Sequence, residues 1–242
     1  MTRTRAATAR RGALLCLHAM MTDGRYFRSF APAAAAAGYD VHVLDFRGHG
    51  ASTPLADWSF DDLVDLDLPA LIAAADCPPD EIVICGHSLG GLVAIAALGC
   101  GRIPPVRAVL LPATAPWLGG SWRRRALMAV YREVTRALGK APIRALRLGT
   151  ADEARTYVAQ LTGWMRSGRW TSLRGIDYLA AARTIDVPVY PVAGDRDWMC
   201  TPDDARGFAA HLPAAQPLRV VPGANHFTLV SRHAAELLAQ LR

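Results

Sequence analysis

The chain has 242 residues, 52% hydrophobic and 20% charged, so it can bury a full core, either as one domain with an insertion or as two domains. Its longest apolar stretches are too short to span a bilayer, and no apolar region typical of a secretion signal follows residues 1–11, so we expect a cytoplasmic protein without a membrane span. The net charge of +6 accompanies no recognised nucleic-acid-binding motif, which argues against a nucleic-acid partner.

Short apolar runs alternate with helical patterns along the chain. Strands are predicted at residues 13–18, 39–46, 82–86, 106–111, 187–193 and 218–221. Helices are predicted at residues 25–37, 59–75 and 233–241, after the strand that ends at 86, and from Thr201–Pro202 onward. We expect Pro69 to kink or interrupt the second of these helices. The alternation predicts an α/β protein with a mostly parallel sheet of about six strands and helices on both faces.

One segment interrupts this alternation. Residues 117–180 contain several amphipathic helical patterns and no convincing strand. We therefore predict a helical cap at 117–180, inserted into a core formed by residues 12–116 and 181–242. Residues 1–11 contain four arginines and no acidic residue, and we expect a basic N-terminal tail that is loosely ordered or crosses an edge of the sheet.

Ser88 lies where a predicted strand meets a predicted helix. The apolar run at residues 82–85 stops at Gly86, and a second apolar pattern, typical of a buried helix, begins after Gly91. Gly86 stands two residues before Ser88 and Gly90 two residues after it, which is what a strained turn that presents a serine side chain requires. The pattern predicts that Ser88 is a nucleophile.

A serine hydroxyl also needs a base, and the base needs an acid to orient it. Asp195 and Asp197 follow the strand at 187–193, and His226 follows the strand at 218–221. The chain order of serine, acid and histidine is the order expected for such a sheet. Both aspartates lie on one loop and remain candidates, and the loop spacing favours Asp197.

Four motifs appear in order along the chain: DFRGHGAS, GHSLGG, AGDRDWMCTP and PGANHF. With them the chain resembles the α/β-hydrolase superfamily along nearly its whole length. The resemblance implies that Ser88, Asp197 and His226 form a catalytic triad and that no cofactor is needed. Residues 19–30 and 163–170 also resemble a poorly characterised, capped bacterial group within that superfamily.

The resemblance further implies two backbone N–H groups that bind the oxyanion. They are those of Leu89, directly after the nucleophile, and of Met20, in the loop after the first core strand. Relatives usually have His-Gly where this chain has His18–Ala19. Because alanine tolerates a positive φ poorly, the loop has reason to follow a different path.

The five cysteines show neither CxxC spacing nor an even number for pairing. We predict buried free thiols rather than disulfides or a zinc site, and therefore no bound metal.

Four of the six tryptophans lie within residues 117–180, which also carry twelve Lys and Arg against four Asp and Glu. As a group the aromatic side chains fit an apolar substrate pocket, although each alone could serve packing. The basic residues fit either a solvated helical face or a surface that attracts an anionic substrate or carrier. The candidate substrate contacts are Met21, His87, Trp117, Trp164 and Trp198, and His87 is also read as a packing residue.

The sequence thus predicts a serine hydrolase that cleaves a hydrophobic carboxylic ester with an anionic end, through an acyl-enzyme intermediate. Thioester hydrolysis on a carrier-linked acyl chain is the second reading, and cleavage of a carbon–carbon bond or acyl transfer would use the same residues. Epoxide hydrolysis and dehalogenation are disfavoured, because the members of the superfamily that catalyse those two reactions have an aspartate where this chain has Ser88. A ligand-binding receptor that retains the fold is the non-enzymatic alternative. The sequence does not disclose the oligomeric state.

Overall fold

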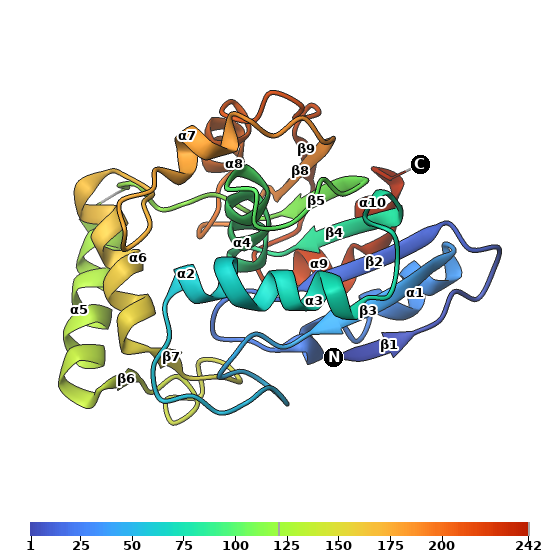
Figure 1. Ribbon diagram of the computed structural model, residues 1–242. Coiled ribbons are helices and arrows are strands. Elements are labelled where there is room, and N and C mark those ends of the chain that lie inside the picture. The colour runs from blue at the N-terminus through green and yellow to red at the C-terminus, as the bar shows by residue number, and fades with distance from the viewer. Residues whose placement is uncertain (121, 242) are drawn as a thin grey trace.

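A mixed sheet forms the centre of the computed structural model, which describes residues 1–120 and 122–241 (Figure 1). Within these residues the sheet has seven strands in the order β1-β3-β2-β4-β5-β8-β9. Strand β1 runs antiparallel to β3, and the other neighbours are parallel, which confirms the mostly parallel α/β sheet. The strands are β1 (Thr2–Thr4), β2 (Gly12–Leu17), β3 (Tyr39–Leu44), β4 (Ile82–Gly86), β5 (Ala108–Pro112), β8 (Val189–Gly194) and β9 (Arg219–Val221).

Helices cover both faces of the sheet. Successive residues of β4 belong to two different core clusters, Ile82 and Ile84 to one and Val83 and Cys85 to the other, because side chains alternate across a strand. The first cluster includes α2 (Phe60–Asp62), α3 (Leu68–Ala74) and α4 (Leu89–Gly99). The second includes α1 (Phe30–Ala36), α9 (Thr228–Arg232) and α10 (Ala234–Ala239). The remaining short helices outside 117–180 are η1 (Gly24–Phe27), η2 (Leu63–Asp67), η3 (Pro79–Glu81) and α8 (Pro202–Ala209).

The helix predicted at residues 59–75 is interrupted before Pro69. Ser59 begins it with a capping box, in which its hydroxyl accepts from the N–H of Asp62 and the Asp62 carboxylate accepts from the N–H of Ser59. A π-helical turn at η2 then separates α2 from α3, and Pro69 stands at the start of α3, where its missing N–H does least harm. The helix predicted at 25–37 is likewise divided, into η1 and α1.

Residues 1–11 are not loosely ordered but cross an edge of the sheet, the second of the two expectations for them. Residues Thr2–Thr4 form β1 at the sheet edge, so the sheet has one strand more than the six predicted. Asp40 of β3 explains the docking, since its carboxylate accepts from the N–H of Ala6 and forms ion pairs with Arg3 and Arg10. These contacts lower the pKa of Asp40, first through the bond from Ala6 and then through Arg10. Arg3 and Arg10 therefore help to hold residues 1–11 against strand β3.

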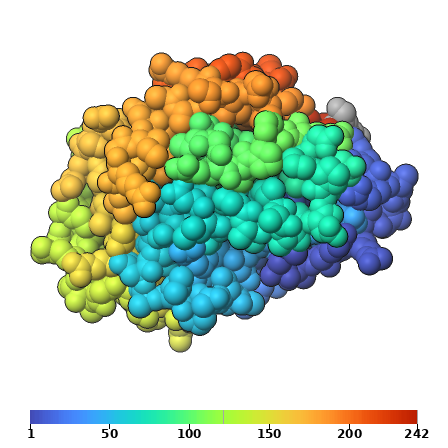
Figure 2. All heavy atoms as spheres, in the orientation of Figure 1, coloured from blue at the N-terminus to red at the C-terminus, as the bar shows by residue number. Residues whose placement is uncertain are grey.

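The segment from 117 to 180 is built from α5 (Trp122–Leu138), β6 (Lys140–Ala141), β7 (Glu153–Ala154), α6 (Arg155–Ser167) and α7 (Tyr178–Ala182). The prediction of no strand there was wrong, because β6 and β7 pair antiparallel. Helices α5 and α6 lie side by side at the end of the molecule opposite the N-terminal strands (Figures 1 and 2). Their buried apolar side chains join the core cluster that contains α4. Across the described ranges, no helix has the length and hydrophobicity to cross a membrane.

Candidate active site

Ser88 occupies a sharp turn between β4 and α4, with φ 51° and ψ −110°. A β-carbon on Gly90 would lie 2.4 Å from the carbonyl oxygen of Leu17, and one on Gly86 would lie 2.6 Å from the backbone of Gly91. These contacts require glycine at both positions. The N–H of Ser88 donates to the carbonyl of Pro112 at 3.1 Å, which fastens the turn to the neighbouring strand β5. A residue in such a strained conformation persists only where its surroundings fix it.

His226 and Asp197 meet beyond the carboxyl ends of β9 and β8, as Ser88 lies beyond the carboxyl end of β4. Nδ1 of His226 lies 2.8 Å from Oδ2 of Asp197, and both residues are buried. Oδ1 of Asp197 accepts the N–H groups of Met199 and Cys200 at 2.8 and 2.9 Å. Asp195 is exposed, and its carboxylate accepts from the N–H of Gly223 instead. Of the two candidate acids, Asp197 is therefore the one that contacts the histidine.

His87 packs behind His226 rather than facing an open site. Its ring is stacked on Tyr26 with centroids 4.9 Å apart, and it lies 4.9 Å from the ring of His226. Burial, and then the neighbouring His226, lower the pKa of His87, so its ring is neutral. The hydroxyl of Tyr26 donates to the backbone carbonyls of His226 and Phe227. Tyr26 thus holds the loop that carries His226, and no motif in the sequence indicates this role.

A small cavity of about 40 Å³ lies beside Ser88. No Lys, Arg, Asp or Glu is among its described lining residues. Of the predicted contacts it includes Met20, Leu89 and Trp117. The lining residues that sequence reasoning missed are Leu92, Ala113, Ala115, Tyr157, Leu161, Met199 and Cys200. Tyr157 and Leu161 stand four residues apart on α6, so their helical spacing was the available signal.

Three predicted substrate contacts lie away from this cavity. Trp164 is buried in a cluster with Phe60 and Trp170, and its indole N–H donates to the carbonyl of Thr171. Trp198 is 57% exposed. Met21 points its N–H toward Glu153. Like His87, none of the three lines the cavity, so the structure assigns them packing or surface positions.

The wall between this cavity and an open hollow of about 390 Å³ is formed by Ala115 and Trp117, because both residues line the two spaces. The indole N–H of Trp117 donates to the carbonyl of Met199 at 2.7 Å, and the guanidinium of Arg124 lies 5.4 Å from the ring centroid. Arg124 is itself bound to Asp204 at 2.9 Å. The wall is therefore held from the 117–180 segment and from the loop after Asp197.

The loop at Ala19–Met21 departs from the expected path. Met21 carries the positive φ, 62°, whereas Ala19 is not among the described non-glycine residues with positive φ. The carbonyl of Ala19 accepts from the hydroxyl of Thr22 and faces Nδ1 of His18. Leu89, the other predicted oxyanion donor, is the first residue of α4, and the first N–H groups of a helix have no partner within it.

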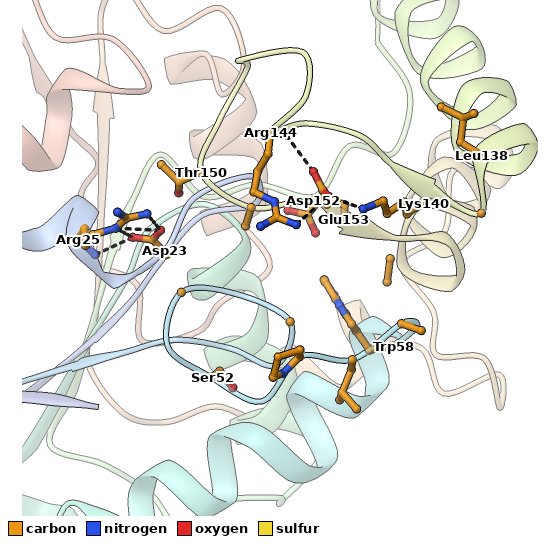
Figure 3. A pocket seen from close by; sticks show the side chains of 18 residues that line it. Asp23, Arg25, Ser52, Trp58, Leu138, Lys140, Arg144, Thr150, Asp152 and Glu153 are labelled. Atoms are coloured by element: carbon orange, nitrogen blue, oxygen red, sulfur yellow. Dashed lines mark hydrogen bonds and ion pairs between the residues drawn. The ribbon is translucent and has the colours of Figure 1, made fainter.

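The same loop is bound to a buried acid. Glu153 accepts from the N–H of Met21, and the same carboxylate oxygen lies 3.3 Å from Nε2 of His49. Figure 3 shows the acid at the edge of an open hollow of about 610 Å³, close to Asp152 and across from Trp58. Ion pairs along this hollow join Asp152 to Lys140 and Asp23 to Arg25.

In the part of the chain that the structure describes, the cysteines and the other possible ligand residues show no arrangement for a metal. All five thiols are free, and Cys16 and Cys85 lie in register on β2 and β4. Over the ranges 1–120 and 122–241, no three His, Cys, Asp or Glu side chains are grouped so as to hold a metal ion.

The chain is similar to known proteins along most of its length. A model described as the alpha/beta hydrolase family matches residues 14–240. The pimeloyl-[acyl-carrier protein] methyl ester esterase of Stenotrophomonas maltophilia is 27% identical over 97% of this chain and 93% of its own. The protein of the same name from Xanthomonas campestris is 30% identical over 88% of this chain and 87% of its own.

Solved structures show the same fold at lower identity. A lipase-esterase related protein from Clostridium acetobutylicum superposes with a TM-score of 0.71 at 15% identity, over 99% of this chain and 97% of its own. An esterase from Exiguobacterium antarcticum gives 0.70 at 16% identity, over 99% and 92%. At this identity the likeness concerns the fold alone.

Proposed function

The chain belongs to the α/β-hydrolase family, and from this membership we propose that it is a serine esterase that uses Ser88, His226 and Asp197. The observation that carries the proposal is the buried contact between Nδ1 of His226 and Asp197, at the same sheet edge as the strained turn of Ser88. A strained serine between glycines, a histidine and a buried acid are the parts that acyl transfer requires.

In the first half of the reaction, Nε2 of His226 removes the proton of the Ser88 hydroxyl as its oxygen attacks the ester carbonyl. Nδ1–H of His226 donates to Asp197, which keeps Nε2 unprotonated beforehand and stabilises the imidazolium afterwards. His226 then gives the proton to the departing alcohol oxygen, and Ser88 is left as an acyl ester.

The negative charge that develops on the carbonyl oxygen is bound by the N–H groups of Leu89 and Met20. Loss of one such donor costs about 3 kcal/mol of transition-state stabilisation. In the second half of the reaction, His226 removes a proton from water, the hydroxide oxygen attacks the acyl carbon, and Ser88 leaves with the proton that His226 returns. The products are a carboxylic acid and an alcohol, without a cofactor.

The charge distribution favours an ester carried by an anionic partner. The cavity beside Ser88 has no Lys, Arg, Asp or Glu among its described lining residues, so it suits a small, neutral ester end. The arginines of α5 lie outside it, and Arg123 and Arg125 are exposed. An anionic group therefore meets this protein at its surface. Both relatives described above are named for a methyl ester on an acyl-carrier protein, and we propose that class of substrate here.

Thioester hydrolysis on a carrier-linked chain remains the second candidate, because the same basic surface would receive the carrier. The two differ in the bond that lies at Ser88. A methyl ester on the far end of the chain releases methanol and leaves the acyl group on its carrier, whereas thioester cleavage frees the acyl chain from it.

The deciding experiment supplies purified protein with an acyl-carrier protein that bears a methyl-ester-terminated acyl chain. We expect methanol release with the chain still attached, together with labelling of the protein by a fluorophosphonate, and neither with Ser88→Ala. Free acyl chain in place of methanol would establish the thioesterase reading. Unlabelled wild type, or equal labelling of Ser88→Ala, would contradict an enzyme and favour a ligand-binding receptor.

A further inference from the structure

Glu153 and His49 form a buried pair that the reaction proposed above does not use. Both side chains are fully buried, and the residues lie 104 positions apart in the chain. His49 belongs to the loop after β3, whereas Glu153 belongs to β7 in the 117–180 segment. Burial of a charged pair is costly unless hydrogen bonds satisfy it, so its presence in contact with Met21 calls for a reason.

The proton between the two residues can be traced. Nδ1 of His49 lies 2.9 Å from the carbonyl of Arg47, and a carbonyl can only accept, so Nδ1 carries a hydrogen. The opposite nitrogen, Nε2, faces Oε1 of Glu153, and a proton lies between them. Burial lowers the pKa of His49, but the Glu153 carboxylate outweighs burial and raises it. The hydrogen bond between Nε2 and Oε1 therefore ties His49 to Glu153.

Oε1 of Glu153 also accepts the N–H of Met21, and this second contact connects the pair to the loop that contains Met20. Met21 has a positive φ of 62°, which a residue with a side chain adopts only when it is held. Its carbonyl accepts from the N–H of Thr150 at 2.8 Å, and a β-carbon on Gly149 would lie 2.2 Å from that oxygen. Residues 149–153 thus bind both the N–H and the carbonyl of Met21.

Met20, directly before Met21, lines the cavity together with Ser88 and Leu89. We propose that the Glu153–His49 pair is a positioning device, which holds the Met20–Met21 loop so that the N–H of Met20 meets the oxyanion. The proposal rests on the proposed esterase function. It makes the oxyanion site depend on the 117–180 segment as well as on the sheet.

The test compares three variants with wild type on a short p-nitrophenyl ester. Glu153→Gln removes the charge. The double variant His49→Phe with Glu153→Leu replaces the buried pair by apolar side chains of similar volume, an exchange that is often neutral or stabilising. Asp152→Asn is the matched control, because Asp152 is the neighbouring residue, pairs with Lys140 and Arg144 on the surface, and does not contact Met21.

We expect kcat to fall by about 10²-fold in Glu153→Gln and in the double variant, with KM within about threefold of wild type, because the oxyanion forms only in the transition state. Asp152→Asn is expected to retain wild-type kcat. A folded double variant, shown by its thermal unfolding, with wild-type kcat would overturn the positioning role. So would equal losses of kcat and stability in Asp152→Asn.

Amide hydrogen exchange on the unaltered protein provides a measurement that needs no variant. We expect slow exchange at Met21, and exchange as fast as in an open loop would contradict the proposal. If wild type neither hydrolyses esters nor is labelled at Ser88, both proposals fall. If wild type is active and both Glu153 variants equal it, only the positioning role falls.

Discussion

Nδ1 of His226 and Oδ2 of Asp197 lie 2.8 Å apart where water has almost no access. The other oxygen of Asp197 accepts two backbone N–H groups, from Met199 and Cys200, so the carboxylate cannot turn without losing them. This geometry determines which ring nitrogen carries the proton, and it leaves Nε2 as the nitrogen that can accept one.

Asp197→Asn is expected to lower kcat by about 10⁴-fold, because an amide at this position favours the wrong tautomer of His226. Steady-state kinetics on a short p-nitrophenyl ester measures the effect. Asp195→Asn is the control and should remain near wild type, since Asp195 contacts Gly223 rather than the histidine. The opposite ranking of the two variants would transfer the acid role to Asp195.

The strained backbone at position 88 should make a glycine variant more stable than an alanine variant. With φ at 51°, Ser88→Gly should unfold at a free energy about 1 kcal/mol higher than Ser88→Ala, because only glycine adopts this conformation without strain. Urea unfolding of the two variants measures the difference. Ser29, with φ −88° and ψ −27° and no side-chain cap hydrogen bond, is the control: alanine adopts this right-handed conformation without strain, so the glycine variant should gain no such stability there. Equal stability at position 88 would show that the turn is not strained.

Trp117 is expected to limit acyl-chain length, because it separates the cavity of about 40 Å³ from the hollow of about 390 Å³. Trp117→Ala should join the two spaces and move the best substrate, by kcat/KM, toward longer p-nitrophenyl esters. Leu118→Ala is the control, since Leu118 lines only the outer hollow. An unchanged chain-length profile in Trp117→Ala would mean that the chain leaves Ser88 by another route.

His18 should make the protein sensitive to acid. Burial, and then the nearby His49, lower its pKa to about 3, and its Nε2 accepts the N–H of Phe46. Between pH 6.5 and 3 the unfolded chain binds a proton that the folded protein does not, so stability falls as the pH falls. His18→Gln should reduce the stability lost between pH 7 and 5 by about 2 kcal/mol in urea unfolding. His211→Gln, at a partly exposed position, should leave the loss unchanged.

The exposed arginines of α5 are expected to serve the carrier and not the chemistry. Arg123→Gln with Arg125→Gln should raise KM for a carrier-linked ester and leave a neutral p-nitrophenyl ester unaffected, with a weaker salt dependence than wild type. Arg124 is left intact, because it supports Trp117 and Asp204. A matching rise in KM for both substrates would refute carrier binding at this surface.

The sheet was predictable because its signals are local. Apolar runs bounded by glycine and proline identify the strands, and Gly86, Ser88 and Gly90 announce the turn within five residues. Strand β1 was missed because three residues that include an arginine carry no apolar pattern, and its partner, Asp40, becomes visible only once β3 is in place.

The surroundings of Ser88 were harder to predict than Ser88 itself. Trp117 and Trp164 look alike in the sequence, yet one lines the cavity and the other packs against Phe60, which only the path of the chain decides. Glu153 follows an ordinary aspartate in a short stretch without a motif. Its contact with His49 spans 104 residues and could not be read from either neighbourhood.

The volume of about 40 Å³ beside Ser88 also bears on the water that the second half of the reaction consumes. About 10–15 Å³ of such a volume suffices to hold one water molecule, so the departure of a methanol from this space leaves room for at least one. Hydrolysis of the acyl-enzyme then follows without any further opening of the site.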